Sequence, residues 1–181
     1  MIKCKKDLIK FLTYEKKIYI PSSLKQRIIM IICHENRYII WKYVKYLRMT
    51  EYYYNMNKSI RRNIMYLLYR RKKNKLGIKL GLEIWENTFD IGLNIWHSGN
   101  IVVNGEAKIG KNCLLRGDNC IGKIYNGKSP IIGDNVDIGV GAKIIGDIQI
   151  GNNVIIGAQS VVNKSFSDDV VIAGVPAKII K

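Results

Sequence analysis

The segment IWHSGNIVVNG, residues 95–105, places a histidine among aliphatic residues. Histidine is the side chain that exchanges a proton near neutral pH, so an accessible imidazole can act as a general base toward a hydroxyl group. His97 is one of only two histidines in 181 residues, which makes it the first candidate for such chemistry. Whether it can act depends on how the surrounding chain presents it.

The chain after His97 repeats every six residues. This period fits neither an α-helix nor an alternating strand, whose periods are about 3.6 and 2 residues. It is typical of a parallel β-helix, in which each short strand sends one aliphatic side chain into the interior. The aliphatic positions, many of them followed by glycine, are Val103, Ile109, Leu115, Ile121, Ile132, Ile138, Ile144, Ile150, Ile156 and Val162.

The repeat leaves the role of His97 open. Extended backwards from Val103, it assigns His97 to an interior position. A second series with the same spacing, Phe89, Ile95 and Ile101, is offset by two residues and would leave His97 outside the core. Periodicity alone therefore fits a structural histidine and a catalytic one equally well.

The repeat is interrupted once, between Ile121 and Ile132, which are eleven residues apart instead of six. The surplus lies in KIYNGKSP, residues 123–130, so a loop is expected to leave the coil there. Insertions in solenoids lie on one face and often carry function, although a neutral insertion would give the same pattern.

Residues 1–80 differ from the rest of the chain. They hold 21 Lys and Arg against 4 Asp and Glu, whereas residues 81–181 hold 9 against 10, and the first 76 residues contain no glycine. Helical spacing predicts helices near residues 24–33 and 39–47, and a third from a Ser59 cap to about Lys75. These differences divide the chain into a basic α-helical N-terminal region, residues 1–80, and a mainly β domain, residues 81–181.

The basic helices suggest three kinds of surface. A solvated basic face over buried tyrosines is the simplest interpretation, and attraction to an anionic membrane surface or a phosphorylated substrate is the second. Nucleic-acid binding ranks last, because no helix-turn-helix, zinc-finger or RNP pattern is present.

The four cysteines, Cys4, Cys33, Cys113 and Cys120, lack the spacing of a zinc site. We expect free thiols, no bound metal and a reducing compartment. No signal peptide is visible, and the apolar run IIMIIC, residues 28–33, is too short to span a bilayer. The sequence therefore predicts a cytoplasmic protein, with the inner face of the membrane as a further location.

Three segments, HSGNIVVNGEAKIG, IGVGAKIIGDIQIGNNVIIGAQSVV and AGVPAKII, make residues 81–181 resemble serine acetyltransferases and related O-acetyltransferases of capsule and polysaccharide clusters. The resemblance implies a left-handed β-helix and a homotrimer that holds acetyl-CoA, as co-substrate, between neighbouring β-helices. It implies that His97 is the general base and that Glu83 orients it. The acetyl-CoA contacts that it implies are Val140, Gly141, Ala142, Gly157, Ala158 and Lys178.

The chain also departs from serine acetyltransferases. Trp96 stands where they have an aspartate that helps to hold the substrate amino group, and Lys128-Ser129-Pro130 replaces their Arg-His-Pro. An aromatic ring suits stacking on a sugar, so Trp96, Lys128 and Ser129 are the predicted acceptor-binding residues.

The main hypothesis is therefore acetyl transfer from acetyl-CoA to a hydroxyl of a sugar or polysaccharide precursor. The alternative is a serine O-acetyltransferase of cysteine biosynthesis, in which Lys128 would bind the carboxylate. A non-catalytic β-helix scaffold or nucleic-acid binder is the third possibility.

Overall fold

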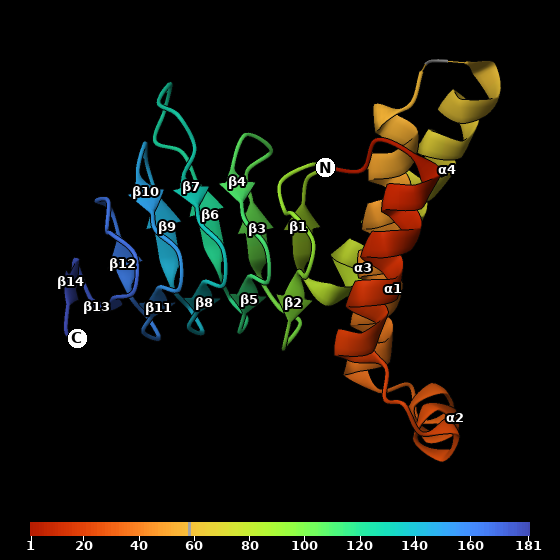
Figure 1. The fold of residues 1–181 in the computed structure, drawn as a ribbon, viewed down its shortest axis with the longest axis horizontal. Helices are drawn as coiled ribbons and strands as arrows, with labels where there is room; N and C mark the ends of the chain where they lie inside the picture. Colours follow the sequence, from red (N-terminus) through yellow and green to blue (C-terminus); the bar gives the residue numbers. More distant parts are fainter. Residues whose placement is uncertain (58) are drawn as a thin grey trace.

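The computed structural model describes residues 1–57 and 59–181. Four helices are followed by fourteen short strands within these residues, and the strands wind into one solenoid (Figure 1). The helices are α1 (Lys5–Tyr19), α2 (Leu24–Ile32), α3 (Asn36–Asn55) and α4 (Ile60–Leu80). The strands are β1 (Leu82–Ile84), β2 (Asn94–Ile95), β3 (Ile101–Val103), β4 (Lys108–Ile109), β5 (Leu114–Leu115), β6 (Cys120–Gly122), β7 (Ile131–Ile132), β8 (Asp137–Ile138), β9 (Lys143–Ile145), β10 (Gln149–Ile150), β11 (Ile155–Ile156), β12 (Val161–Val162), β13 (Val171–Gly174) and β14 (Ala177–Ile179).

The strands form the three faces of a prism. Their orders are β1-β3-β6-β9-β12, β10-β7-β4 and β14-β13-β11-β8-β5-β2. Each strand pairs in parallel with the equivalent strand one coil away, and the β13–β14 hairpin at the C-terminal end is the antiparallel exception. This arrangement confirms the parallel β-helix that the six-residue period predicts.

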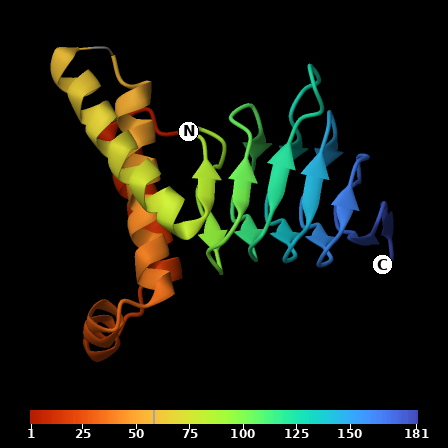
Figure 2. The same cartoon turned by 180° about the vertical axis from the view of Figure 1, so that it is seen from behind.

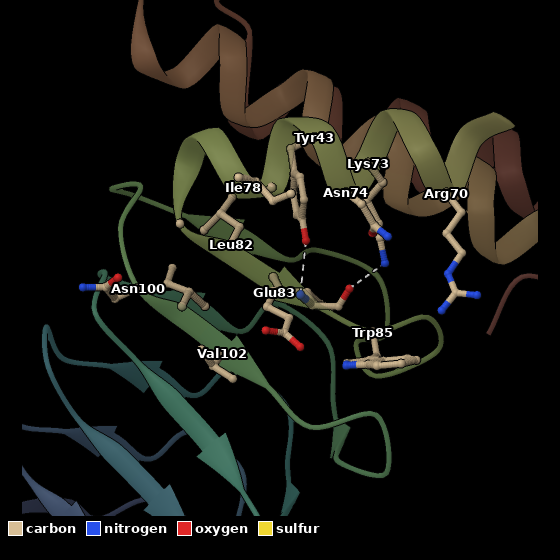
Figure 3. Close-up of a pocket in the computed structure, with 14 residues that line it drawn as sticks. Tyr43, Arg70, Lys73, Asn74, Ile78, Leu82, Glu83, Trp85, Asn100 and Val102 are labelled. Carbon is tan, nitrogen blue, oxygen red and sulfur yellow. Dashed lines mark hydrogen bonds between the residues drawn. The ribbon is translucent and has the colours of Figure 1, made fainter. Parts of the chain in front are cut away.

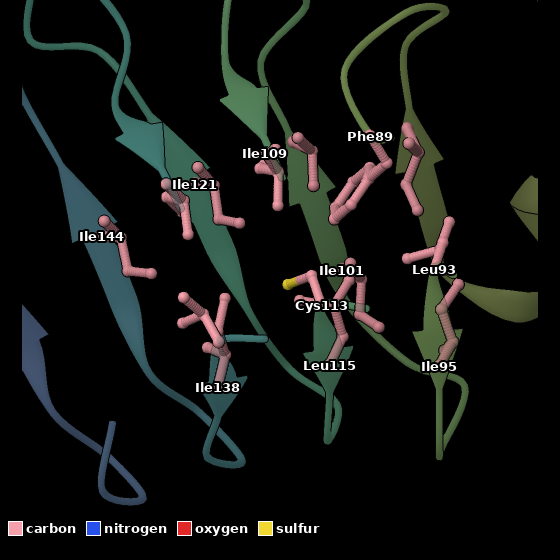
Figure 4. Close-up of a cluster of buried hydrophobic side chains, with 14 of the residues drawn as sticks. Phe89, Leu93, Ile95, Ile101, Ile109, Cys113, Leu115, Ile121, Ile138 and Ile144 are labelled. Carbon is pink, nitrogen blue, oxygen red and sulfur yellow. The ribbon is translucent and has the colours of Figure 1, made fainter. Parts of the chain in front are cut away.

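The aliphatic residues of the repeat fill the interior of the prism (Figure 4). All ten predicted positions are buried, and they stack on their equivalents, as Leu115 does on Ile138. The residues two positions earlier, such as Cys113 and Ala142, are buried beside them. Each coil therefore depends on the coils above and below to cover its apolar side chains. The first coil has a neighbour on one side only, so it needs a cap on the other.

Asparagines form one corner of the prism. Asn112, Asn135 and Asn153 all have positive φ values, of 56°, 58° and 56°, a conformation that asparagine tolerates better than most residues. Their side-chain amides donate along the stack, from Asn112 to Asn135, from Asn135 to Asn153 and from Asn153 to Asp169. This ladder fixes the turn of each coil over the next.

The helices cover the N-terminal end of the solenoid (Figures 1 and 2). α3 packs against α1 and α4, and buried residues of α3 belong to the same apolar cluster as the solenoid interior. The predicted helix 24–33 matches α2, and the predicted third helix begins after the Ser59 cap but runs to Leu80 instead of ending near Lys75. Gly81 ends it in the left-handed conformation, with φ 65°.

Side chains of the helices satisfy the backbone groups of the first coil. The Tyr19 hydroxyl donates to the Leu93 carbonyl (2.9 Å) and accepts from the Ile95 amide (2.8 Å). The Tyr43 hydroxyl accepts from the Ile84 amide, and the Lys73 ammonium donates to the Ile84 carbonyl. An unpaired strand edge would expose these groups, so the cap replaces the coil that is missing on this side.

A buried ion cluster anchors the same cap. Arg48 is fully buried and pairs with Glu15 (2.7 Å) and Glu51 (2.9 Å). It also donates to the carbonyls of Phe89 and Asp90. Burial by itself would lower the pKa of Arg48, but the two carboxylates outweigh that effect and raise it above the ordinary arginine value.

Candidate active site

His97 lies on a corner of the prism that is wider than its equivalents. Ile95 pairs with Leu115 of the next coil, and Val103 pairs with Ile121. The chain therefore advances eight residues from Ile95 to Val103, but only six from Leu115 to Ile121. The two additional residues push the chain outward at 97–100, and His97 is exposed. The offset series through Ile95 is thus the one that fills the core, and His97 is not part of the interior stack.

The N-terminal helices hold this corner in place. The Ser98 hydroxyl donates to the side-chain oxygen of Asn36 at the start of α3 (3.1 Å). The Gly99 amide donates to the carbonyl of Leu80 at the end of α4 (2.8 Å). Sequence reasoning missed both contacts, because the partners are far apart in the chain and nothing in either segment marks them.

A guanidinium group stands over the ring of Trp96, one residue before His97. Arg116 lies 4.4 Å from the ring centroid and is itself held by two hydrogen bonds to Asp137, at 2.8 and 2.6 Å. Side-chain hydrogen bonding to Asp137 raises the pKa of Arg116. Trp96 as a residue is 41% exposed, and a cation–π contact occupies one face of its ring, where the sequence predicts a stacked sugar.

The edge that bears Trp96 and His97 continues along the solenoid. The amides of Trp96, Arg116, Gly139 and Gly157 donate in turn to the carbonyls of Leu115, Ile138, Ile156 and Ile172. Each step is one coil, about 4.8 Å, so Gly157 lies roughly 14 Å along the edge from Trp96. His97 and four of the predicted acetyl-CoA residues, 140–141 and 157–158, therefore line one edge.

The individual acetyl-CoA predictions fall in different surroundings. The side chains of Val140 and Ala158 are exposed on the edge, and Gly141 and Gly157 stand beside them. A Cβ on Gly157 would come within 2.8 Å of the Ala173 side chain, so glycine allows the close approach of the next coil. Ala142, by contrast, is fully buried, so its side chain points into the solenoid.

Lys178 lies on the last hairpin of the described strands, next to that edge. It is exposed on β14, where it pairs with Ala173 of β13. Ala173 is the residue that approaches Gly157, so Lys178 stands at the C-terminal end of the same edge.

Glu83 lies in a cavity between α4 and the β1–β3 face (Figure 3). It pairs with Val102 in the β1–β3 ladder, and the cavity has a volume of about 400 Å³. Within the part of the chain that the structure describes, no hydrogen bond joins Glu83 to His97. Its predicted orienting role stays a prediction.

The segment 123–130 leaves the coil as predicted and projects beyond the neighbouring turns (Figure 1). Lys128 is 84% exposed at its side chain and lies 3.8 Å from Asp147. Ser129 is buried, and its hydroxyl donates to the side-chain oxygen of Asn104 (2.9 Å). Within this chain, Ser129 therefore fixes the base of the loop, while Lys128 stays at its surface.

The described residues contain no group of three or more His, Cys, Asp and Glu side chains that could hold a metal ion. Among the same residues, no helix is long and apolar enough to cross a membrane.

Comparison with known proteins gives the fold and its relatives. Residues 129–164 match the bacterial transferase hexapeptide family, described as six repeats. The serine acetyltransferase of Synechococcus elongatus is 37% identical over 92 residues, which cover 49% of this chain and 38% of that protein. The serine acetyltransferase of Staphylococcus aureus is 38% identical over 92 residues, covering 49% and 43%. The chain thus spans less than half the length of these relatives.

Solved structures match nearly the whole chain. The soybean serine acetyltransferase apoenzyme has a TM-score of 0.75 at 20% identity and covers 97% of this chain and 70% of that one. The Neisseria gonorrhoeae serine acetyltransferase in complex with serine has a TM-score of 0.69 at 23% identity, covering 98% and 70%. The fold is therefore the left-handed hexapeptide-repeat β-helix preceded by helices, as the sequence predicts.

The predicted sugar acceptor is wrong. The curated relatives and the solved structures cited above are serine acetyltransferases, and none of them supports closeness to polysaccharide-cluster enzymes. Part of the physical argument for a sugar was stacking on the Trp96 ring, and the Arg116 guanidinium already lies 4.4 Å from the centroid of that ring. The comparisons favour the alternative hypothesis instead.

Proposed function

We propose that this protein is an acetyl-CoA-dependent serine O-acetyltransferase. The observation that carries the proposal is the widened corner at 97–100. It holds an exposed histidine at the head of an edge whose later turns present small residues and backbone to solvent. A base outside the core, beside a long shallow edge, suits transfer of a group from an extended carrier to a small alcohol.

In this proposal His97 acts as the general base. Its ring nitrogen takes the proton from the serine hydroxyl while that oxygen forms a bond to the acetyl carbonyl carbon. The carbon–sulfur bond of the thioester then breaks, and the proton passes from the imidazolium to the departing thiolate. The oxyanion that forms on the acetyl group needs hydrogen-bond donors that are fixed before the reaction begins.

Acetyl-CoA would lie along the edge from His97 toward Val140, Gly141, Gly157 and Ala158. Lys178 at the far end would meet a coenzyme phosphate as a point charge. A solved serine acetyltransferase in complex with CoA has this fold, with a TM-score of 0.73. The homotrimer belongs to the same proposal, since an edge on one prism offers only one wall of a groove.

The basic helices have a role in this account that needs neither membrane nor nucleic acid. Arg48 and Lys73 are buried in ion pairs that close the first coil. Docking of the remaining basic residues on an anionic membrane stays a prediction of the sequence.

The test is direct identification of the product. Purified protein with acetyl-CoA and L-serine is expected to release thiol and to form O-acetyl-L-serine, detected by mass spectrometry. Folded protein that binds acetyl-CoA but yields no O-acetyl-L-serine would refute serine as the acceptor.

A further inference from the structure

Helix α2 carries its apolar side chains on the side that faces away from the protein. Figures 1 and 2 show α2 at one end of the helical cap, apart from the solenoid. Within α2, which the structure describes in full, Met30 is the one buried residue, and Arg27 beside it donates to the Pro21 carbonyl (2.7 Å). A surface helix normally turns its apolar stripe inward, so an outward stripe points to a partner. The side chains of the stripe have helical spacing and are 48–76% exposed: Leu24, Ile28, Ile31 and Ile32.

The chain around this stripe is strongly basic. Residues 16–37 contain one carboxylate, Glu35, and five cations, which are Lys16, Lys17, Lys25, Arg27 and Arg37. Two of the cations lie in the last turn of α1, two lie on α2, and one lies in the first turn of α3. Cations from three helices therefore flank the exposed aliphatic side chains.

A cavity of about 400 Å³ opens between α2 and the end of α1. Ile18 and Ile29 contribute apolar walls, and Lys17, Arg37 and Glu35 contribute charged groups. The Arg37 guanidinium is held at this place by a hydrogen bond to the Ile18 carbonyl. Apolar walls beside two cations suit the junction between an anionic headgroup and its acyl chain.

An anionic bilayer matches both properties of this surface. Its interface accepts aliphatic side chains, and its headgroups attract Lys and Arg. A second copy of α2 would cover the aliphatic stripe, but it would bring Lys25 and Arg27 against their own equivalents without a carboxylate on either helix. A nucleic acid would meet the positive charges, but it would leave the aliphatic side chains against a polar backbone.

We propose that α2 is a peripheral membrane anchor, which lies in the headgroup region of an anionic bilayer and buries Leu24, Ile28 and Ile32 among the acyl chains. Its nine residues extend about 14 Å, less than half of a hydrocarbon core, so the helix lies along the interface. The flanking lysines and arginines contact the headgroups. The inference does not depend on the proposed acetyl transfer, because it concerns a helix outside the edge that bears His97.

The test is flotation of the full chain with lipid vesicles in a density gradient. One set of vesicles contains phosphatidylcholine alone, and the other contains equal parts of phosphatidylcholine and phosphatidylglycerol. Ile28→Ser removes an aliphatic side chain from the stripe, and Lys25→Gln removes a charge beside it. The matched controls are Ile9→Ser and Lys10→Gln, which change exposed residues in the first half of α1.

We expect wild type to float with the mixed vesicles but not with phosphatidylcholine alone, and to bind less as the salt concentration rises. Ile28 is 48% exposed, so about half of its burial is still to be gained, and Ile28→Ser should lower the partition coefficient about 3- to 10-fold. Lys25→Gln should lower it about fivefold. Ile9→Ser and Lys10→Gln should stay within about twofold of wild type, and melting temperatures near wild type would show that all four variants are folded.

Three results overturn the inference. The first is flotation that is absent with both vesicle compositions or equal with both. The second is binding that Lys25→Gln weakens and Ile28→Ser leaves unchanged, which would assign the contact to the charge of the helices alone. The third is a smaller assembly of Ile28→Ser in analytical ultracentrifugation with unchanged flotation, which would assign α2 to a contact between copies of the chain.

Discussion

Replacing Arg48 by methionine tests how the helical cap holds the solenoid. Arg48 neutralises Glu15 and Glu51, and all three side chains are buried. Removing the cation leaves two buried carboxylates without a compensating charge. Breaking a buried ion pair in this way lowers the free energy of unfolding by about 3–5 kcal/mol. For a chain of this length, that free energy corresponds to a fall in melting temperature of about 6–20 °C.

The loss of unfolding free energy in Arg48→Met should depend on pH. Burial raises the pKa of Glu51 in the folded protein, and the charge of Arg48 opposes that rise. Without Arg48 the folded-state pKa rises further above the unfolded value, so the folded variant takes up a proton in the window above about pH 4.3. Its stability must therefore decrease as the pH rises through that window, and the gap to wild type should be wider at pH 8 than at pH 5.

Urea unfolding followed by circular dichroism measures both effects. Lys45→Met is the matched control, because Lys45 is an exposed basic residue of the same helix and its loss should cost less than about 0.5 kcal/mol. Adding Glu15→Gln and Glu51→Gln to Arg48→Met should restore part of the stability. A loss below about 1 kcal/mol for Arg48→Met, or one that does not vary with pH, would refute this account of the cap.

Three further predictions concern the same core. A thiol reagent should modify the exposed Cys4 and Cys33 quickly in the native protein and Cys113 only on unfolding, since burial raises the pKa of Cys113; fast labelling of Cys113 would contradict its place in the core. Tyr19→Phe should lower the free energy of unfolding by about 1–3 kcal/mol in denaturant titration, because it removes a donor to a first-coil carbonyl; an unchanged midpoint would argue against the cap. Gly133→Ala should lower the melting temperature by several degrees, since the new Cβ would lie 2.7 Å from backbone of the next coil, and a wild-type melting curve would show that the coils can separate there.

The solenoid could be predicted from the sequence because its period is local and repeated. Each coil makes the same contacts as its neighbours. The six-residue spacing is therefore enough to predict that residues such as Ile138 and Ile156 are buried. The inserted loop could be located for the same reason, as a break in that spacing.

The cap and the corner could not be predicted, because they depend on contacts across the chain. Arg48 reads as one more basic residue of a basic helix until Glu15, 33 residues earlier, is brought against it. His97 fitted two series of the repeat, and only the pairing of Ile95 with Leu115 decides between them. Trp96 read as a free aromatic surface because Arg116 lies one coil further along.

The most direct test of the central claim is the rate of serine-dependent thiol release from acetyl-CoA by His97→Ala. His34→Ala is the control, since it alters the other histidine, which is exposed in the turn after α2. The account predicts that His97→Ala lowers kcat about 10²- to 10⁴-fold, the usual contribution of a general base, while His34→Ala stays near wild type. Equal activity of His97→Ala and wild type would contradict it.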